Sequence, residues 1–283
     1  MKIGAIEVNG QKCYGEVRGN QLYPFKLKGV AVTDLISVIE AQGELKVDDT
    51  GYDLEKYQLV APVGPLRKNI FCVGKNYVDH SKEFAKSGFD NSAADLPSDP
   101  IIFTKAPTTV ANPNAAIRAD ADPTGTVDYE GELGVIIGRR CTAADTGTAY
   151  DYVFGYTIVN DVTSRELQRK HGQWFIGKNL DGYCPVGPVV VTADEFGPLD
   201  EIWLKTHVNG EERQAAQLKD LIFDVPTIIA TISAYCTLEP GDLIATGTPA
   251  GVGIGFTPPR YLAPGDRVSV SVDRIGELVN TVV

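Results

Sequence analysis

Methionine, tryptophan and histidine are scarce in this chain of 283 residues, which contains one, two and three of them respectively. With only three histidines, the chain offers few candidates for a base that works near neutral pH. The five cysteines are scattered and form no CxxC pair, which argues against a zinc knuckle and against a disulfide framework. Unpaired thiols fit a reducing compartment, so we expect a cytoplasmic protein.

Long apolar runs are also missing. The segment MKIGAIEVNG lacks the apolar core of a signal peptide, and residues 221–238, the most apolar stretch, contain Asp224 and Pro226. A net charge of -11 disfavours nucleic acid and anionic membranes as partners. The same charge repels an anionic substrate, so binding one requires a metal ion or a cluster of lysine and arginine.

The distribution of turns and strands predicts two unequal domains. Residues 1–60 contain short strand-like runs, an Asn9-Gly10 hairpin signal and one short helix in 32–43. The segment APVGPL, with two prolines and a glycine, is the best boundary. We therefore predict a small N-terminal α/β domain over 1–66 and a larger catalytic domain over 67–283.

The larger part is rich in strands that lack regular alternation with helices. A helix is expected over 76–86, followed by a polar segment, 87–100, that we interpret as a mobile lid. An amphipathic helix is expected from Val225 to Cys236, and a hairpin that turns at 273–276 ends the chain. This pattern predicts a β-rich α+β fold, a sandwich or roll with helices on its flank.

The segment VDYEGELGVIIG contains a candidate metal site. Glu130 and Glu132 lie two apart in a strand pattern, so both carboxylates point to one face. Two carboxylates this close favour a hard cation such as Mg2+ or Mn2+, although a solvated strand face gives the same pattern. Asp161, which ends the strand YVFGYTIVND, is a third candidate ligand or a helix cap.

The helix that is expected after Asp161 adds an anion site. Thr163 and Glu166 form a possible capping box, which leaves Asp161 available for other contacts. Asp161, Arg165 and Gln168 have the spacing of one helical face, and an acid, a cation and an amide together suit a metal beside an anion. A solvated salt bridge between Asp161 and Arg165 is the alternative.

Three further residues are candidates for catalysis. His80 and Glu83 have the i, i+3 spacing in which a carboxylate orients an imidazole that acts as a general base. Lys178, next to Trp174 and Phe175, is suited to hold an oxyanion or a carboxylate. The alternatives are a surface histidine beside a glutamate and a surface lysine. The glycine-rich segment 245–255 lacks a following helix, but its amides can bind a carboxylate.

Six ordered motifs closely resemble the fumarylacetoacetate hydrolase family, from about Lys68 to the C-terminus: VGKNYVDHSKEF, FTKAP, VDYEGELGVIIG, FGYTIVNDVTSRELQ, GKNLDGYCPVGP and LEPGDLIATGTPAGVG. The resemblance implies a mixed β-sandwich roll that is usually a homodimer. It implies that Glu130, Glu132 and Asp161 bind Mg2+ or Mn2+, with Ca2+ as a substitute in a crystal. It places His80 and Glu83 over the substrate, and the implied substrate contacts are Lys75, Tyr77, Arg165, Gln168, Lys178, Gly247 and Thr248.

The family resemblance leaves the reaction open. The first hypothesis is hydrolysis of a C–C bond in an acylpyruvate or related 2,4-diketo acid, which releases pyruvate and a carboxylic acid. Here His80, aided by Glu83, activates water, and Lys178 assists charge development. The alternative uses the same site for oxaloacetate decarboxylation or for keto–enol tautomerisation of a 2-oxo acid. A catalytically silent member ranks last because the three carboxylates and the His80/Glu83 pair are all present.

Overall fold

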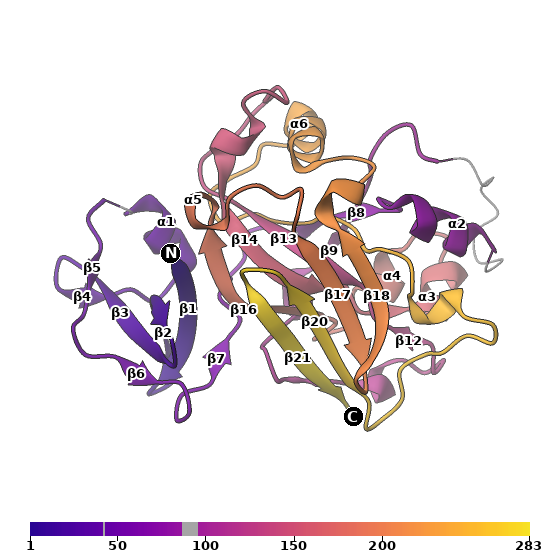
Figure 1. Cartoon of the computed structure of the whole chain (residues 1–283), viewed down its shortest axis with the longest axis horizontal. Coiled ribbons are helices and arrows are strands. Elements are labelled where there is room, and N and C mark those ends of the chain that lie inside the picture. Colours follow the sequence, from indigo (N-terminus) through magenta and orange to yellow (C-terminus); the bar gives the residue numbers. More distant parts are fainter. Residues whose placement is uncertain (42, 87–95) are drawn as a thin grey trace.

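The computed structural model describes residues 1–41, 43–86 and 96–283 (Figure 1). Most of the segment expected to form a lid, 87–100, lies outside these residues. The strands are β1 (Lys2–Val8), β2 (Gln11–Arg18), β3 (Gln21–Leu27), β4 (Val30–Ala31), β5 (Lys46–Val47), β6 (Tyr52–Asp53), β7 (Leu59–Val60), β8 (Ile70–Gly74), β9 (Ile101–Lys105), β10 (Val110–Ala111), β11 (Ala116–Ile117), β12 (Val127–Asp128), β13 (Gly131–Ile137), β14 (Val153–Asn160), β15 (Thr163–Ser164), β16 (Cys184–Thr192), β17 (Trp203–Val208), β18 (Glu211–Gln217), β19 (Leu243–Ala245), β20 (Arg267–Val272) and β21 (Gly276–Val282).

Helices are fewer and short. They are α1 (Leu35–Glu40), α2 (Val78–Lys86), α3 (Arg165–Lys170), α4 (Phe175–Lys178), α5 (Ala193–Phe196) and α6 (Val225–Tyr235), with short 3-10 turns between strands. Within the described residues, no helix is long and apolar enough to cross a membrane. The predicted β-rich fold with flanking helices is confirmed.

A large sheet of 14 strands forms the body of the molecule, in the order β4-β3-β2-β1-β16-β14-β13-β19-β8-β9 with four short strands attached. Its centre, β13 and β14, is an antiparallel pair in which Gly131 lies opposite Asn160. Every residue of β13 is buried, which explains its nearly continuous apolar sequence, GELGVII. The two central strands therefore carry the residues at their ends into the interior.

A second sheet of five strands, β11-β21-β20-β17-β18, packs against the first. Leu204 and Val270 from this sheet share one apolar cluster with Val135 and Ile158 from the large sheet. In Figure 1, β17, β18, β20 and β21 lie together in front of β13 and β14, and α6 lies at one end of the sandwich. Two sheets joined by inward-facing apolar side chains form the core of a β-sandwich roll.

The N-terminal 60 residues form a sheet that continues into the large one. β1 pairs antiparallel with β16, with Ile3 opposite Val190, and also with β2 and β7. The helix expected in 32–43 is α1, where Asp34 caps the first turn by accepting a hydrogen bond from the Ser37 amide at 2.8 Å. The boundary at 61–66 stays a prediction.

Local turn and helix signals were reliable. Asn9, with φ 51°, and Gly10 connect β1 to β2 as the hairpin signal predicted, and the final hairpin turns between β20 and β21. The apolar pattern from Val225 gives α6, which begins after the cap Asp224 and ends at Tyr235, one residue before the predicted end. These signals depend on neighbouring residues alone, which explains why sequence reasoning found them.

Candidate active site

Three buried carboxylates meet at the ends of the two central strands. Glu130 directly precedes β13, Glu132 is its second residue, and Asp161 directly follows β14. The amide of Asp161 donates to the carbonyl of Glu130 at 2.8 Å, which extends the strand pairing to the site. One oxygen from each carboxylate lies within 4.8 Å of the others. The structure therefore brings the three predicted ligands together.

Lysine and arginine side chains surround two of these carboxylates. Lys178 Nζ donates to Glu130 Oε2 and to Asp161 Oδ2, each at 2.7 Å. Arg165 donates to the other oxygen of Glu130 at 2.7 Å, and Lys105 Nζ lies 2.7 Å from Asp161 Oδ1. Both oxygens of Glu130 and of Asp161 thus face a cation.

The two glutamates differ in the environment of their charge. Burial raises the pKa of Glu130, but the positive charges of Lys178 and Arg165 outweigh burial and lower that pKa to about 2. Burial also raises the pKa of Glu132, and the neighbouring charges of Asp161 and Glu130 raise it further. Glu132 accepts a hydrogen bond from the Gly247 amide at 2.7 Å and has no ion pair among the described residues. Among the three carboxylates, Glu132 is therefore the one that no described lysine or arginine contacts directly.

The donor set fits a hard divalent cation. Four buried carboxylates, Asp128, Glu130, Glu132 and Asp161, lie among three cations, Lys105, Arg165 and Lys178. Asp161 Oδ1 also lacks a hydrogen bond within the described part of the chain, because Lys105 approaches it outside hydrogen-bonding geometry. An all-oxygen set with excess negative charge is what Mg2+ or Mn2+ prefers.

The glycine-rich segment binds carboxylates through its amides, and these carboxylates belong to the chain itself. The Gly247 amide donates to Glu132, and the Gly251 amide donates to Glu83 at 3.0 and 3.1 Å. Asp128 accepts from Gly253 and Ile254 amides. The carboxylates that these amides bind in the structure are therefore side chains of the protein itself.

Asp128 fixes the position of Arg165. Its Oδ2 accepts from Arg165 Nε at 2.8 Å, and both residues are buried. A buried guanidinium needs such a partner, because an unpaired buried charge is costly. Arg165 in turn contacts Glu130 and Gln168, at 2.7 and 3.3 Å, while its Nη2 has no partner among the described residues.

His80 and Glu83 lie on one face of α2, as predicted. His80 Nδ1 is 3.4 Å from Glu83 Oε2, which is a long contact for a hydrogen bond. His80 is buried, and its ring lies 6.0 Å from that of Phe84. Because the Gly251 amide holds the Glu83 carboxylate, the orientation of His80 depends on the glycine-rich segment as well as on α2.

Two predictions about the segment after Asp161 were wrong. The helix begins only at Arg165, so Asp161 is not on its face, and the partners of Arg165 are Asp128 and Glu130. The Thr163 capping box is also absent, because Thr163 lies in β15 and donates to the Asp161 carbonyl at 2.9 Å. Because β12 pairs with β15, Thr163 and Ser164 form a short strand and are not part of the helix.

Arg165, Gln168 and Lys178 are supported by two short helices in close contact. Gly177 of α4 lies against α3, and a Cβ atom at this position would be 2.3 Å from the Gln168 nitrogen. Such an approach is available only to glycine. Lys178 is therefore fixed relative to Gln168 by backbone contact.

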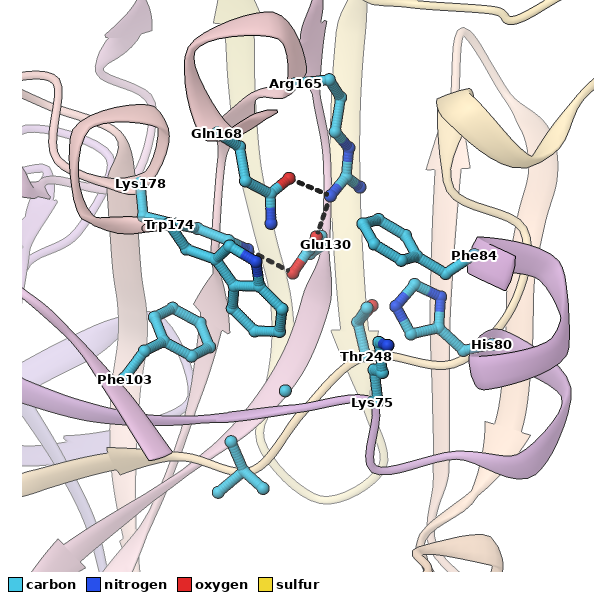
Figure 2. A pocket seen from close by; sticks show the side chains of 12 residues that line it. Lys75, His80, Phe84, Phe103, Glu130, Arg165, Gln168, Trp174, Lys178 and Thr248 are labelled. Carbon is cyan, nitrogen blue, oxygen red and sulfur yellow. Dashed lines mark hydrogen bonds and ion pairs between the residues drawn. The ribbon is translucent and has the colours of Figure 1, made fainter. Parts of the chain in front are cut away.

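Seven of the predicted site residues line one narrow cavity of about 20 Å³ (Figure 2). They are Lys75, His80, Glu130, Arg165, Gln168, Lys178 and Thr248, together with the apolar residues Phe84, Phe103 and Trp174. In Figure 2, His80 and Phe84 project from α2 on the side opposite Lys178 and Trp174.

The other predicted site residues do not line the cavity. Glu132, Asp161 and Gly247 are buried next to the lining residues, and Glu83 lies behind His80. Tyr77 is buried, and its hydroxyl has no partner among the described residues. Its side chain does not line the cavity in this conformation.

Sequence reasoning missed three buried polar residues at this site: Lys105, Asp128 and Gln214. Asp128 was within reach, because it lies two positions before Glu130 in the same alternating pattern. Lys105 and Gln214 come from β9 and β18, and their contacts depend on tertiary pairing that local spacing does not reveal.

The chain is similar to proteins of a known family. Residues 69–283 match the model of the fumarylacetoacetate (FAA) hydrolase C-terminal domain. The chain belongs to the fumarylacetoacetate hydrolase family. The chain is 47% identical over 231 residues to oxaloacetate tautomerase YisK of Bacillus subtilis, which covers 82% of this chain and 75% of that protein. The resemblance seen in the motifs is confirmed.

Solved structures of family members share the whole fold. A fumarylacetoacetate hydrolase from Exiguobacterium antarcticum is 42% identical with a TM-score of 0.84, over 100% of this chain and 99% of that one. A 2-hydroxyhepta-2,4-diene-1,7-dioate isomerase from Mycobacterium marinum is 35% identical with a TM-score of 0.78, over 100% and 98%. These relatives are named as enzymes, and their names include hydrolase, isomerase and tautomerase.

Proposed function

We propose that this protein is a divalent-metal-dependent keto–enol tautomerase of a small 2-oxo acid, with oxaloacetate as the first substrate to test. The observation that carries the proposal is that one imidazole, His80, faces the same narrow cavity as Glu130, Arg165 and Lys178. The similarity to an oxaloacetate tautomerase over most of the chain supports this reaction over C–C bond hydrolysis.

The reaction needs a proton to leave carbon C3 of the substrate and a proton to reach the 2-oxo oxygen. Glu130, Glu132 and Asp161 would hold Mg2+ or Mn2+, which supplies Lewis-acid polarisation of the 2-oxo group. His80 takes the proton from C3, and Glu83 stabilises the imidazolium that results. The proton then returns to the substrate at oxygen, so that no water is consumed.

The cations of the cavity bind the substrate carboxylate. Arg165 has one terminal nitrogen, Nη2, without a partner among the described residues, and Gln168 lies beside it. A guanidinium held by Asp128 and Glu130 binds a carboxylate without reorganisation. Lys178 supports the charge that develops on the 2-oxo oxygen, and Lys75 lies at the edge of the same cavity.

The test is to follow the ultraviolet absorbance of enol-oxaloacetate in the presence of the full-length protein. Conversion should require Mg2+ or Mn2+ and should be lost in His80→Ala. A parallel pyruvate assay reports decarboxylation, which needs no base at C3. Full activity in metal-stripped protein would contradict the proposal.

Hydrolysis of an acylpyruvate is the second candidate. The contact between His80 and Glu83 suits activation of a water molecule, and a structural neighbour with 42% identity is named a hydrolase. A panel of acylpyruvates, assayed for pyruvate release beside oxaloacetate, separates the two reactions. Pyruvate release from acylpyruvates, faster than tautomerisation, would favour hydrolysis.

We also propose that the protein is a homodimer, as the family resemblance implies. Light scattering coupled to size-exclusion chromatography tests this directly. A mass near the 30.5 kDa of one chain would contradict it.

A further inference from the structure

Thr248 lies in the wall of the cavity that also contains Glu130 and His80 (Figure 2). It belongs to the glycine-rich segment, and only 3% of its surface is exposed. A hydroxyl has one hydrogen to donate and two lone pairs that accept. The direction in which Thr248 uses them decides which substrate atom it can contact.

The side chain of Gln214 fixes one side of this hydroxyl. Gln214 is buried in β18, on the second sheet, and its Oε1 accepts a hydrogen bond from the Gly131 amide at 3.1 Å. Its Nε2 donates to the Pro249 carbonyl and to Thr248 Oγ1, both at 2.7 Å. The amide cannot be turned over, because Oε1 would then face a carbonyl and Nε2 an N–H group.

The hydrogen of Thr248 is committed as well. Its Oγ1 donates to the carbonyl of Gly131 at 2.9 Å. Gln214 already donates to Thr248 Oγ1 and occupies one of its two lone pairs. The hydroxyl therefore keeps one lone pair and has no hydrogen left for the cavity.

We infer that Thr248 acts in this cavity only as a hydrogen-bond acceptor, and that it selects ligands that present an O–H group to it. The Gly131 carbonyl takes the hydrogen, and Gln214 is the positioning residue that occupies one lone pair and so helps to hold the hydroxyl in this direction. An enol or a 2-hydroxy acid carries such a group, whereas a keto or carboxylate oxygen would set lone pair against lone pair. The inference rests on the proposed function only in taking the enol as the relevant tautomer.

The remaining polar groups of the wall make this selection asymmetric. Arg165, Lys178 and Lys75 are all cations that donate hydrogen bonds, and the acceptors of Glu130 and Gln168 are used by Arg165 and Lys178. His80, the proposed base, is the other acceptor among these lining residues. Thr248 therefore adds an acceptor to a wall whose cations otherwise favour anions. It contributes to the choice between tautomers and adds nothing to the binding of a carboxylate.

The test is calorimetric titration of the full chain, saturated with Mg2+, by two small probes. Glycolate has one carboxylate and one O–H group, and oxalate has acceptors only. Thr248→Val should weaken the binding of glycolate by about three- to tenfold, which corresponds to the loss of one hydrogen bond. The affinity for oxalate should stay within about twofold of the wild-type value. Thr248→Ser should restore glycolate binding. Equal weakening of both probes, as expected from a general disturbance or from an intervening water, overturns the inference.

Gln214→Met tests the positioning role. Without the amide, the Thr248 hydroxyl is held only by the Gly131 carbonyl and can rotate to donate to the cavity. Oxalate should then bind more tightly, and the preference for glycolate over oxalate should fall by a similar factor. An unchanged preference overturns the role of Gln214, and the Thr248 variants decide the main inference if this variant does not fold. Binding is measured without turnover, so failure of tautomerisation alone would reject the proposed reaction and not this inference.

Discussion

The two sides of the cavity are built differently. On the carboxylate side, Glu130 and Asp161 are held by three buried cations at contact distances of 2.7 Å. On the opposite side, the one polar contact of His80 within the described residues is that with Glu83, at 3.4 Å, on α2, which ends at Lys86. Within the described part of the chain, one side is fixed by redundant charges and the other by few polar contacts.

This difference separates two tasks. A cation site must keep its ligands in place, and redundant ion pairs do so within a buried interior. A base that transfers protons has to approach and leave the substrate, and a looser attachment allows this. The glycine-rich segment links both sides, because its amides bind Asp128 and Glu132 on the first and Glu83 on the second.

The largest effect on stability is expected from Asp128→Asn. The change removes one of the two carboxylate partners of the buried Arg165 and places an amide nitrogen against backbone N–H groups, which should cost about 3–5 kcal/mol in the free energy of unfolding. Urea denaturation measures it. Asp120→Asn is the control, because its pair with Arg118 is exposed and its loss should leave the free energy of unfolding nearly unchanged. Equal losses in both variants would contradict a rigid carboxylate side.

The largest effect on metal binding is expected from Glu132→Gln. Residues that only support a ligand contribute about 10- to 100-fold to metal affinity, so loss of a ligand charge should cost more than about 100-fold, with a matching fall in turnover. Calorimetry with Mn2+ measures it. Glu195→Gln, at an exposed carboxylate, should leave affinity unchanged. Wild-type affinity in Glu132→Gln would exclude this carboxylate as a ligand.

A smaller effect is expected on the base side. Glu83→Gln weakens the orientation of His80 and the Gly251 contact, and should lower kcat by about tenfold, part of the contribution of a general base. The free energy of unfolding should change by less than about 1 kcal/mol, because the carboxylate is half-buried and makes few contacts. A stability loss as large as that of Asp128→Asn would show that both sides are equally rigid.

The smallest effect is a dependence of stability on pH. The raised pKa of Glu132, caused by burial and by neighbouring carboxylates, means that the metal-free fold binds this proton more tightly than the unfolded chain. Stability of the metal-free protein should therefore fall as pH rises above the ordinary glutamate range. Metal binding requires the charged form, so the rise in Tm caused by Mg2+ should grow with pH, and Glu132→Gln should abolish that growth.

Much of this site was predictable, because its groups lie in short motifs. Glu130 and Glu132 share a strand pattern, and His80 and Glu83 share a helical face, so local periodicity was sufficient. The β-rich class followed in the same way from short strands without regular helices.

What the sequence could not supply depends on strand pairing. Asp161 was expected on a helix with Arg165, but the pairing of β12 with β15 places a strand there. Lys105 and Gln214 reach the site from opposite sheets, and no spacing along the chain relates them to Glu130 or Thr248. The choice between tautomerisation and hydrolysis depends on the substrate, which no single residue type specifies.

The contact between α3 and α4 through Gly177 has a mechanical consequence. Backbone that touches backbone leaves no soft side chain between the two helices, so displacement of one is transmitted to the other without loss. A ligand that draws Gln168 toward it must also shift Lys178, the lysine that donates to both Glu130 and Asp161. Substrate binding is therefore coupled to the geometry of the carboxylates through the rigid contact between the two short helices.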